Sequence, residues 1–99
     1  MAAVTVAELL IGVELGSGAR RKARERYVTT VLATIPAEPY DVDVARAHAR
    51  LLAHARRSGR PRGAHDLIIA ATALARGRTI VTADTTGFDD LPGVVTMAA

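Results

Sequence analysis

Three acidic residues stand at positions where a carboxylate could do chemistry. Glu8 falls in the first turn of an expected helix, Asp66 near the start of a later helix, and Asp84 directly after an expected strand. Ligand sites of parallel sheets lie just beyond the carboxyl ends of the strands, so these acids could converge at one edge. A cluster of carboxylates needs cations to hold it together, and hard oxygen ligands select Mg²⁺ or Mn²⁺. The pattern therefore predicts a metal site formed by Glu8, Asp66 and Asp84.

Each acid also has a purely structural interpretation. Thr5 and Glu8 fit a capping box, in which a hydroxyl and an acid three residues later satisfy the first backbone N–H groups of a helix. Asp66 in a first turn would gain a few tenths to about 1 kcal/mol from the helix dipole. Asp84 could close an Asx turn. The residues alone leave both interpretations open for all three acids.

The elements that must position these acids alternate between strand and helix. The first half of the chain is expected to contain a strand end over residues 2–6, a helix ended by Gly16-Ser17-Gly18, a helix over about 19–32 and an extended link over 33–39. A helix capped by Asp41 or Asp43 then runs to about 57, and a loop over 58–63 leads to the helix of Asp66, which Gly77 ends. A short buried strand over 79–82, turns over 85–93 and a last strand over 94–97 complete the chain. This alternation predicts an α/β fold with a parallel sheet and right-handed crossovers.

The helix that carries Asp66 is expected to open near His65 or Asp66 and to be buried on every side, because the residues after Asp66 are apolar on all faces. The preceding helix is expected to bury one stripe, formed by Val44, Ala47, His48, Leu51, Leu52 and Ala55. The three histidines, His48, His54 and His65, do not have the spacing of a zinc site. They are expected to be structural or solvent-facing.

Composition limits the class of protein. Ninety-nine residues are enough for one small domain, spanning 1–99, and 49% hydrophobic with 23% charged residues is ordinary for a globular protein rather than a disordered one. The absence of cysteine excludes disulfides and thiolate metal sites. No apolar run reaches the roughly 18 residues of a membrane span. We therefore expect no membrane association and a cytoplasmic location.

The basic residues are almost all arginine. The net charge is +3, and 12 of the 13 basic residues are Arg, gathered mainly in the segments 20–26 and 56–62. The planar arginine fork binds phosphate through two hydrogen bonds, which favours nucleic acid as a partner, although a solvated helix face explains the first cluster as well. An acidic metal site approached by arginine-bearing loops suits a phosphodiester substrate.

Three segments of the chain resemble, in order and spacing, the successive motifs of PIN-domain ribonucleases, specifically the VapC toxins of bacterial toxin-antitoxin pairs. They are residues 5–13 (TVAELLIGV), 63–73 (GAHDLIIAATA) and 80–88 (IVTADTTGF), and the resemblance covers essentially the whole chain. It implies a three-layer α/β/α fold and a magnesium-dependent (or manganese-dependent) endoribonuclease that cleaves RNA. It also implies a homodimer neutralised by a cognate VapB-type antitoxin. Glu8, Asp66 and Asp84 match the family's glutamate, third acid and fourth acid.

One departure from the family pattern concerns the start of the chain. The family begins with a strand that carries an aspartate, whereas this chain opens at Met1 in what corresponds to the second strand. We therefore expect an N-terminally truncated fold whose exposed strand edges need another partner. Three hypotheses follow: an active toxin nuclease, an inactive remnant that still binds antitoxin, and a small basic nucleic-acid-binding module whose binding is sensitive to salt but indifferent to magnesium.

Overall fold

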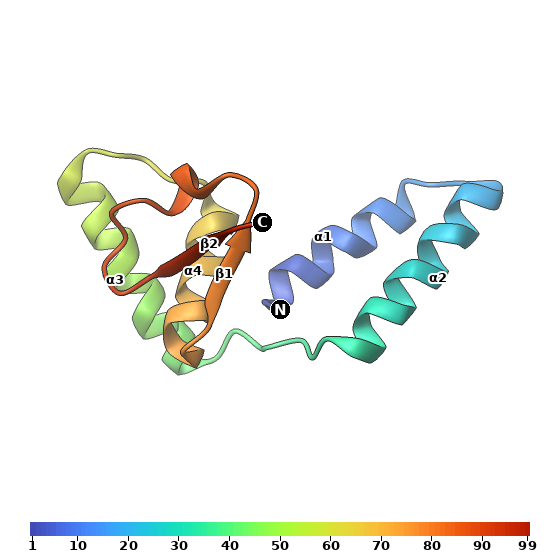
Figure 1. Cartoon of the computed structure of the whole chain (residues 1–99), viewed down its shortest axis with the longest axis horizontal. Coiled ribbons are helices and arrows are strands. Elements are labelled where there is room, and N and C mark those ends of the chain that lie inside the picture. Colours follow the sequence, from blue (N-terminus) through green and yellow to red (C-terminus); the bar gives the residue numbers. More distant parts are fainter. The chain divides into compact units, whose positions relative to one another are not determined.

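The computed structural model describes residues 1–99, which divide into two compact units, Met1–Pro39 and Tyr40–Ala99. In chain order the elements are α1 (Ala3–Glu14), α2 (Gly18–Thr34), α3 (Val42–Ser58), α4 (Ala64–Arg76), β1 (Thr79–Thr82), the 3₁₀ helix η1 (Thr85–Phe88) and β2 (Val95–Ala98) (Figure 1). Helices combined with a parallel strand pair confirm the predicted α/β class. No helix has both the length and the apolar character needed to cross a membrane. That residues 1–99 form a single domain stays a prediction.

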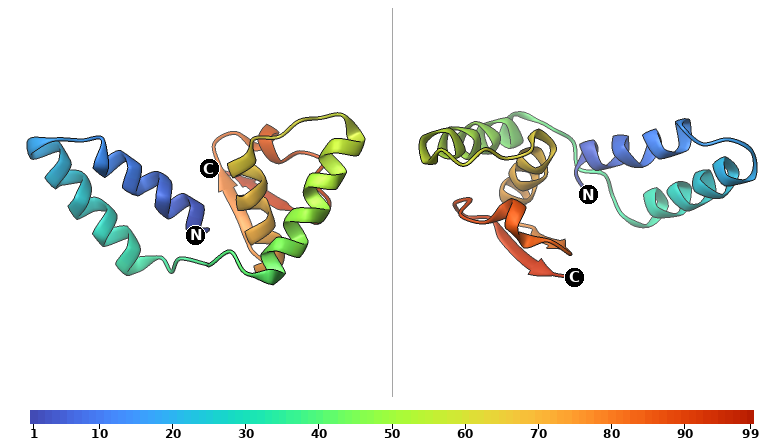
Figure 2. Two further views of the ribbon diagram at one scale, coloured as in Figure 1. Left: turned by 180° about the vertical axis from the view of Figure 1, so that it is seen from behind. Right: turned by 90° about the horizontal axis from the view of Figure 1, so that it is seen from above.

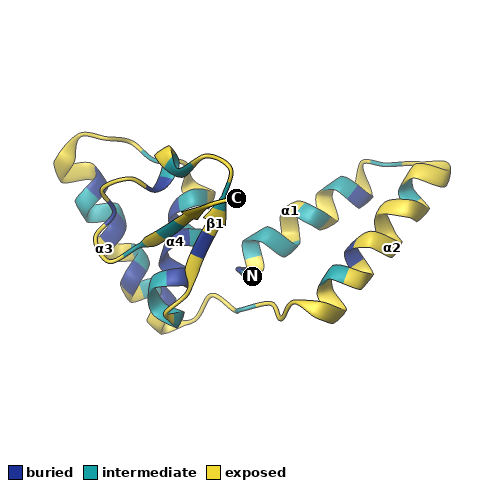
Figure 3. Ribbon diagram, viewed as in Figure 1, coloured by how far each residue is buried: buried dark blue, intermediate teal, exposed yellow.

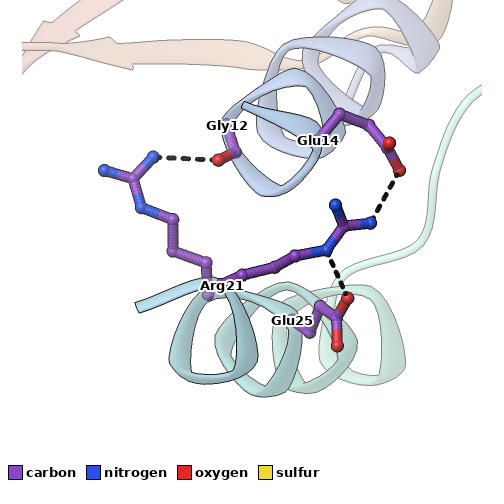
Figure 4. A network of polar contacts seen from close by, with 5 residues as sticks. Gly12, Glu14, Arg21 and Glu25 are labelled. Carbon is purple, nitrogen blue, oxygen red and sulfur yellow. Dashed lines mark hydrogen bonds and ion pairs between the residues drawn. The ribbon is translucent and has the colours of Figure 1, made fainter. Parts of the chain in front are cut away.

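The first unit is a pair of helices, α1 and α2, joined by a short turn. Val13 of α1 and Val28 of α2 are its buried helical side chains. Arg21 of α2 contacts Glu14 of α1 at 3.5 Å and Glu25 at 3.2 Å, as Figure 4 shows. These ion pairs are exposed, so each contributes at most about 1 kcal/mol. Part of the basic segment 20–26 thus connects the two helices.

The expected strand over residues 2–6 is wrong, since α1 already begins at Ala3. Only Ala2 pairs with another segment, as an isolated parallel bridge to Glu38. The β-branched residues of this stretch favour a strand, but they lead directly into the helix formers that follow. Each residue that extends an existing helix adds one backbone hydrogen bond. A strand that pairs through one isolated bridge gains fewer hydrogen bonds for the same number of ordered residues.

Of the two interpretations of Glu8, the capping box with Thr5 is wrong. The N-cap of α1 is Ala2, which makes no side-chain capping bond, so Glu8 lies well inside the helix and is exposed. The apolar residues on its side, Ile11 and Leu15, are exposed as well. The helix α2 extends two residues further than expected, and residues 35–39 follow as the extended link that Pro36 and Pro39 require.

The second unit is built on the pair α3 and α4, whose ends lie within two residues of the expected ones; α4 begins at Ala64, slightly before the expected start at His65 or Asp66. Asp41 caps α3, its Oδ1 accepting a hydrogen bond of 3.1 Å from Val44 N. Gly59 and Gly77 follow the two helices with φ of 67° and 65°, a left-handed conformation that glycine adopts without strain. The core between the helices and the sheet is formed by Val44, Ala47, Leu51, Leu67, Ala70, Ala71, Ala73, Ile80, Phe88 and Leu91.

The predicted apolar stripe of α3 is largely confirmed. Four of its six members are buried, while His48 and Leu52 are partly buried. The Tyr40 hydroxyl lies 2.8 Å from His48 Nδ1, and the two rings meet edge to face. His48 is thus held by a local contact, consistent with the structural role expected for it.

The strands β1 and β2 form a parallel pair in which Thr79 aligns with Val95 and Thr82 with Ala98. The helices of this unit lie on one face of the pair (Figure 2), and part of β1 is buried (Figure 3). The buried residue of β1 is Ile80. Val81, on the opposite face, is 59% exposed. The expectation of a buried strand is therefore wrong for Val81, because a strand is buried on both sides only where elements cover both faces.

Candidate active site

Asp66 and Asp84 line one polar pocket of about 220 Å³ in the second unit. Three segments form its walls: the loop between α3 and α4, the first turn of α4, and the turn that leads into η1. Its lining residues are Arg60, Pro61, Arg62, Gly63, Asp66, Asp84, Thr86 and Gly87. The structure therefore brings two of the three predicted acids together. Glu8 belongs to the other unit, and its part in the site stays a prediction.

Asp66 is the third residue of α4 and does not cap the helix. The N-cap is Gly63, which makes no side-chain capping bond, and the partly buried Asp66 carboxylate accepts no hydrogen bond and forms no ion pair. Burying a carboxylate costs free energy unless a partner compensates its charge, and the helix dipole offsets only a small part of this cost. An uncompensated carboxylate that lines a pocket is suited to hold a cation.

Two glycines leave room around this carboxylate. A Cβ atom on Gly87 would lie 3.2 Å from Asp66 Oδ2, and a Cβ atom on Gly63 would lie 3.4 Å from the same oxygen. A side chain at position 87 would therefore crowd one oxygen of the Asp66 carboxylate. Neither glycine was identified from the sequence as a site residue, although both lie in the segments 63–73 and 80–88 that carry the family resemblance.

Asp84 is held in a fixed orientation by Thr86. Its Oδ1 accepts hydrogen bonds from Thr86 N at 3.0 Å and from Thr86 Oγ1 at 2.6 Å, which makes Asp84 the N-cap of η1. The Asx-turn interpretation is therefore correct, and it is compatible with metal binding because these bonds use only one of the two carboxylate oxygens. The Thr86 hydroxyl and backbone N–H, which favour the charged carboxylate, hold the pKa of Asp84 below its usual value.

Thr86→Ala is expected to raise the pKa of Asp84 toward its ordinary value of 3.8, because the variant loses the hydroxyl bond and keeps the backbone bond. A carboxylate whose folded-state pKa is lowered stabilises the fold above its unfolded-state pKa, and this contribution is lost as the pH falls through the folded-state pKa. The difference between the two proteins should therefore appear below about pH 4. NMR titration of the Asp84 carboxyl carbon measures the shift. Thr85→Ala is the control, and an equal shift in both variants would contradict the assignment.

Arg62 connects two walls of the pocket. Its Nη1 donates a hydrogen bond of 3.1 Å to Thr86 O, and its Nη2 donates to Asp89 O. The guanidinium thereby ties the loop before α4 to η1, which follows Asp84. Arg60 lines the pocket too and pairs with Asp90.

The sequence indicated arginines of the segment 56–62 as phosphate contacts. The structure places Arg60 and Arg62 on the wall of the acidic pocket, whereas Arg57 is exposed and does not line it. Since two donors of Arg62 are engaged by backbone carbonyls, its first role is to position the pocket.

The residues of the pocket fit a hard divalent cation. Within Tyr40–Ala99, no third His, Asp or Glu joins Asp66 and Asp84 to complete a group of three ligands. Mg²⁺ is commonly bound by one or two carboxylates and completes its shell with water and substrate phosphate oxygens. Two carboxylates in a polar pocket therefore suit Mg²⁺ or the similar Mn²⁺, and they do not suit a zinc site of nitrogen or sulfur ligands.

The chain matches a known protein family over most of its length. The family model of the PIN domain matches residues 1–94. The chain is 37% identical over 93 residues to VapC ribonuclease Y4jK of Sinorhizobium fredii and 35% identical over 92 residues to toxin FitB of Neisseria gonorrhoeae, covering 90% and 89% of this chain. It spans 66% of the length of each of these relatives.

Solved structures agree. The crystal structure of VapBC-5 from Mycobacterium tuberculosis, a member of the VapBC family of toxin-antitoxin systems, matches with a TM-score of 0.85 and 32% identity over 99% of this chain and 79% of that one. The resemblance drawn from the three sequence motifs is thus confirmed. The chain belongs to the PIN-domain family, with VapC ribonucleases among its relatives.

Proposed function

We propose that this chain is the toxin of a type II toxin-antitoxin pair and a metal-dependent endoribonuclease. The observation that carries the proposal is the single pocket that Asp66 and Asp84 line together with Arg60 and Arg62. Carboxylates that hold a cation beside arginines suit the cleavage of a phosphodiester bond. The names of the relatives, a VapC ribonuclease and a toxin, support the same activity.

In this proposal the residues of the pocket have distinct roles. Asp66 and Asp84 would hold Mg²⁺ or Mn²⁺, with Glu8 as the proposed third ligand. When bound there, such an ion would supply positive charge that offsets the charge of the substrate phosphate. Thr86 keeps the Asp84 carboxylate charged and oriented, Arg62 fixes the turn that carries it, and Arg60 offers a cation to the substrate phosphates.

A metal-removal experiment tests the activity. The purified chain should cleave RNA in MgCl₂ or MnCl₂, lose cleavage in excess EDTA, and regain it when either metal is added back, because the acids cannot bind a phosphate without a cation. Cleavage is measured on gels with a panel of end-labelled structured RNAs. RNA binding that is unaffected by metal and is not followed by cleavage would contradict the enzyme and favour the basic binding module.

The proposed partners are an RNA substrate, a VapB-type antitoxin and a second copy of the chain. Support for protein partners comes from the VapBC-5 complex among the similar structures and from the exposed apolar side chains of the first unit. They include Leu10, Ile11, Leu15, Tyr27 and Leu32. Clustered apolar side chains at a surface commonly mark a protein interface. An inactive remnant would keep these contacts and bind antitoxin without cleaving RNA.

A further inference from the structure

A second pocket lies beside the acidic pocket, and its character is different. It has a volume of about 330 Å³ and lies between the end of α3, the following loop and the start of α4. Leu52, Ala55 and Leu67 make much of its wall apolar, and Arg56 and Arg62 contribute to its rim. It is therefore a mainly apolar pocket whose lining includes two arginines.

The two pockets are adjacent, because Pro61 and Arg62 line both of them. A molecule bound at the acids could thus extend past Pro61 into the apolar pocket. This arrangement suits a ligand with an anionic part at one end and a flat or apolar part at the other.

We propose that the apolar pocket receives a nucleobase of the RNA substrate, next to the phosphate that is held at the acids. This inference rests on the proposed ribonuclease function. The base lies against Leu52 and Leu67 and stacks on the guanidinium of Arg56. Unpaired bases in RNA are commonly bound in this way, by stacking on planar side chains. An apolar side chain of a protein partner is the competing occupant.

Binding to RNA lacking single bases tests the proposal without cleavage. Affinities are measured in EDTA for a short single-stranded RNA and for versions of it with one abasic site at each position. Loss of one stacked base should weaken binding about fivefold or more at one position. The same scan is made with Arg56→Ala and with Arg57→Ala, which removes a neighbouring arginine of equal charge that does not line the pocket.

The loss of affinity caused by the abasic site should persist in Arg57→Ala. This abasic penalty should disappear in Arg56→Ala, because the base has already lost its stacking partner in that variant. A penalty that is equal in all three proteins, or absent at every position, would overturn the proposal. So would an Arg56→Ala variant that loses binding to a co-purified antitoxin and keeps the abasic pattern, because the pocket would then serve the protein partner.

A second pair of variants changes the volume of the pocket. Ala55→Met places a longer side chain in the wall of the pocket, whereas Ala49→Met places the same side chain on the exposed side of α3. Only Ala55→Met should remove the abasic penalty. If Ala55→Met and Ala49→Met change this penalty equally, the result would contradict the binding of a base in the pocket.

Failure of this inference can be told from failure of the proposed function. Magnesium-dependent cleavage without any position-specific penalty would overturn the base pocket and leave the ribonuclease in place. A penalty that depends on Arg56, in a chain that never cleaves RNA, would support the base pocket and contradict the enzyme.

Discussion

Asp66→Asn is expected to lower metal-dependent RNA cleavage at least about a hundredfold and to leave the fold in place. The substitution keeps the size of the side chain and removes the negative charge that lines the pocket with Asp84. A metal ion contributes several kcal/mol of charge stabilisation in the transition state, and each 1.4 kcal/mol is a factor of about ten in rate. The Asp66 carboxylate makes no hydrogen bond within the protein, so the free energy of unfolding should fall by at most about 1 kcal/mol.

Asp43→Asn is the matched control for this prediction. Asp43 lies in the first turn of α3 as Asp66 lies in the first turn of α4, but Asp43 does not line the acidic pocket. Both variants lose the same interaction with a helix dipole, and only Asp66→Asn should lose cleavage. The assays are single-turnover cleavage in Mg²⁺ and thermal unfolding of each variant. If Asp66→Asn cleaves normally and unfolds at a much lower temperature, the acid is structural.

The helices of the second unit could be predicted because their ends carry strong local signals. Asp41 begins α3 as a capping residue, and Gly59 and Gly77 end the two helices in the left-handed conformation. The first unit has weaker signals at its start. Three of the residues 2–6 are β-branched (Val4, Thr5 and Val6). Such a short segment can form a strand or the start of a helix, depending on the segment that it packs against. The pairing of Ala2 with Glu38 spans most of this unit, and local sequence does not encode such a contact.

The part of the candidate site that depends on the ends of helices and strands could also be predicted from the sequence. Asp66 and Asp84 follow from the expected positions of a helix start and a strand end, which α/β topology brings to one edge of the sheet. The role of Arg62 could not be found in this way. Its hydrogen bonds reach 24 and 27 residues along the chain, to backbone carbonyls that carry no side-chain signal. The structure alone identifies it as the residue that holds the two walls together.

Leu51→Ala is expected to remove the cooperative folding of the second unit. Leu51 is 1% exposed and belongs to the core that α3 and α4 share. Truncating a fully buried leucine costs about 2 to 5 kcal/mol, partly through the cavity it leaves. A unit the size of Tyr40–Ala99 has a total stability of only about 3 to 9 kcal/mol. Urea unfolding followed by circular dichroism measures the loss.

The control for this prediction is Leu15→Ala, which truncates the same side chain at a site that is 84% exposed, and it should change stability by no more than about 0.5 kcal/mol. Because α3 holds the helix that carries Asp66, Leu51→Ala should lose RNA cleavage together with the fold. Asp66→Asn should lose cleavage and keep the fold. An Leu51→Ala protein with unchanged unfolding and normal cleavage would show that the pocket does not depend on the packing of α3 against α4.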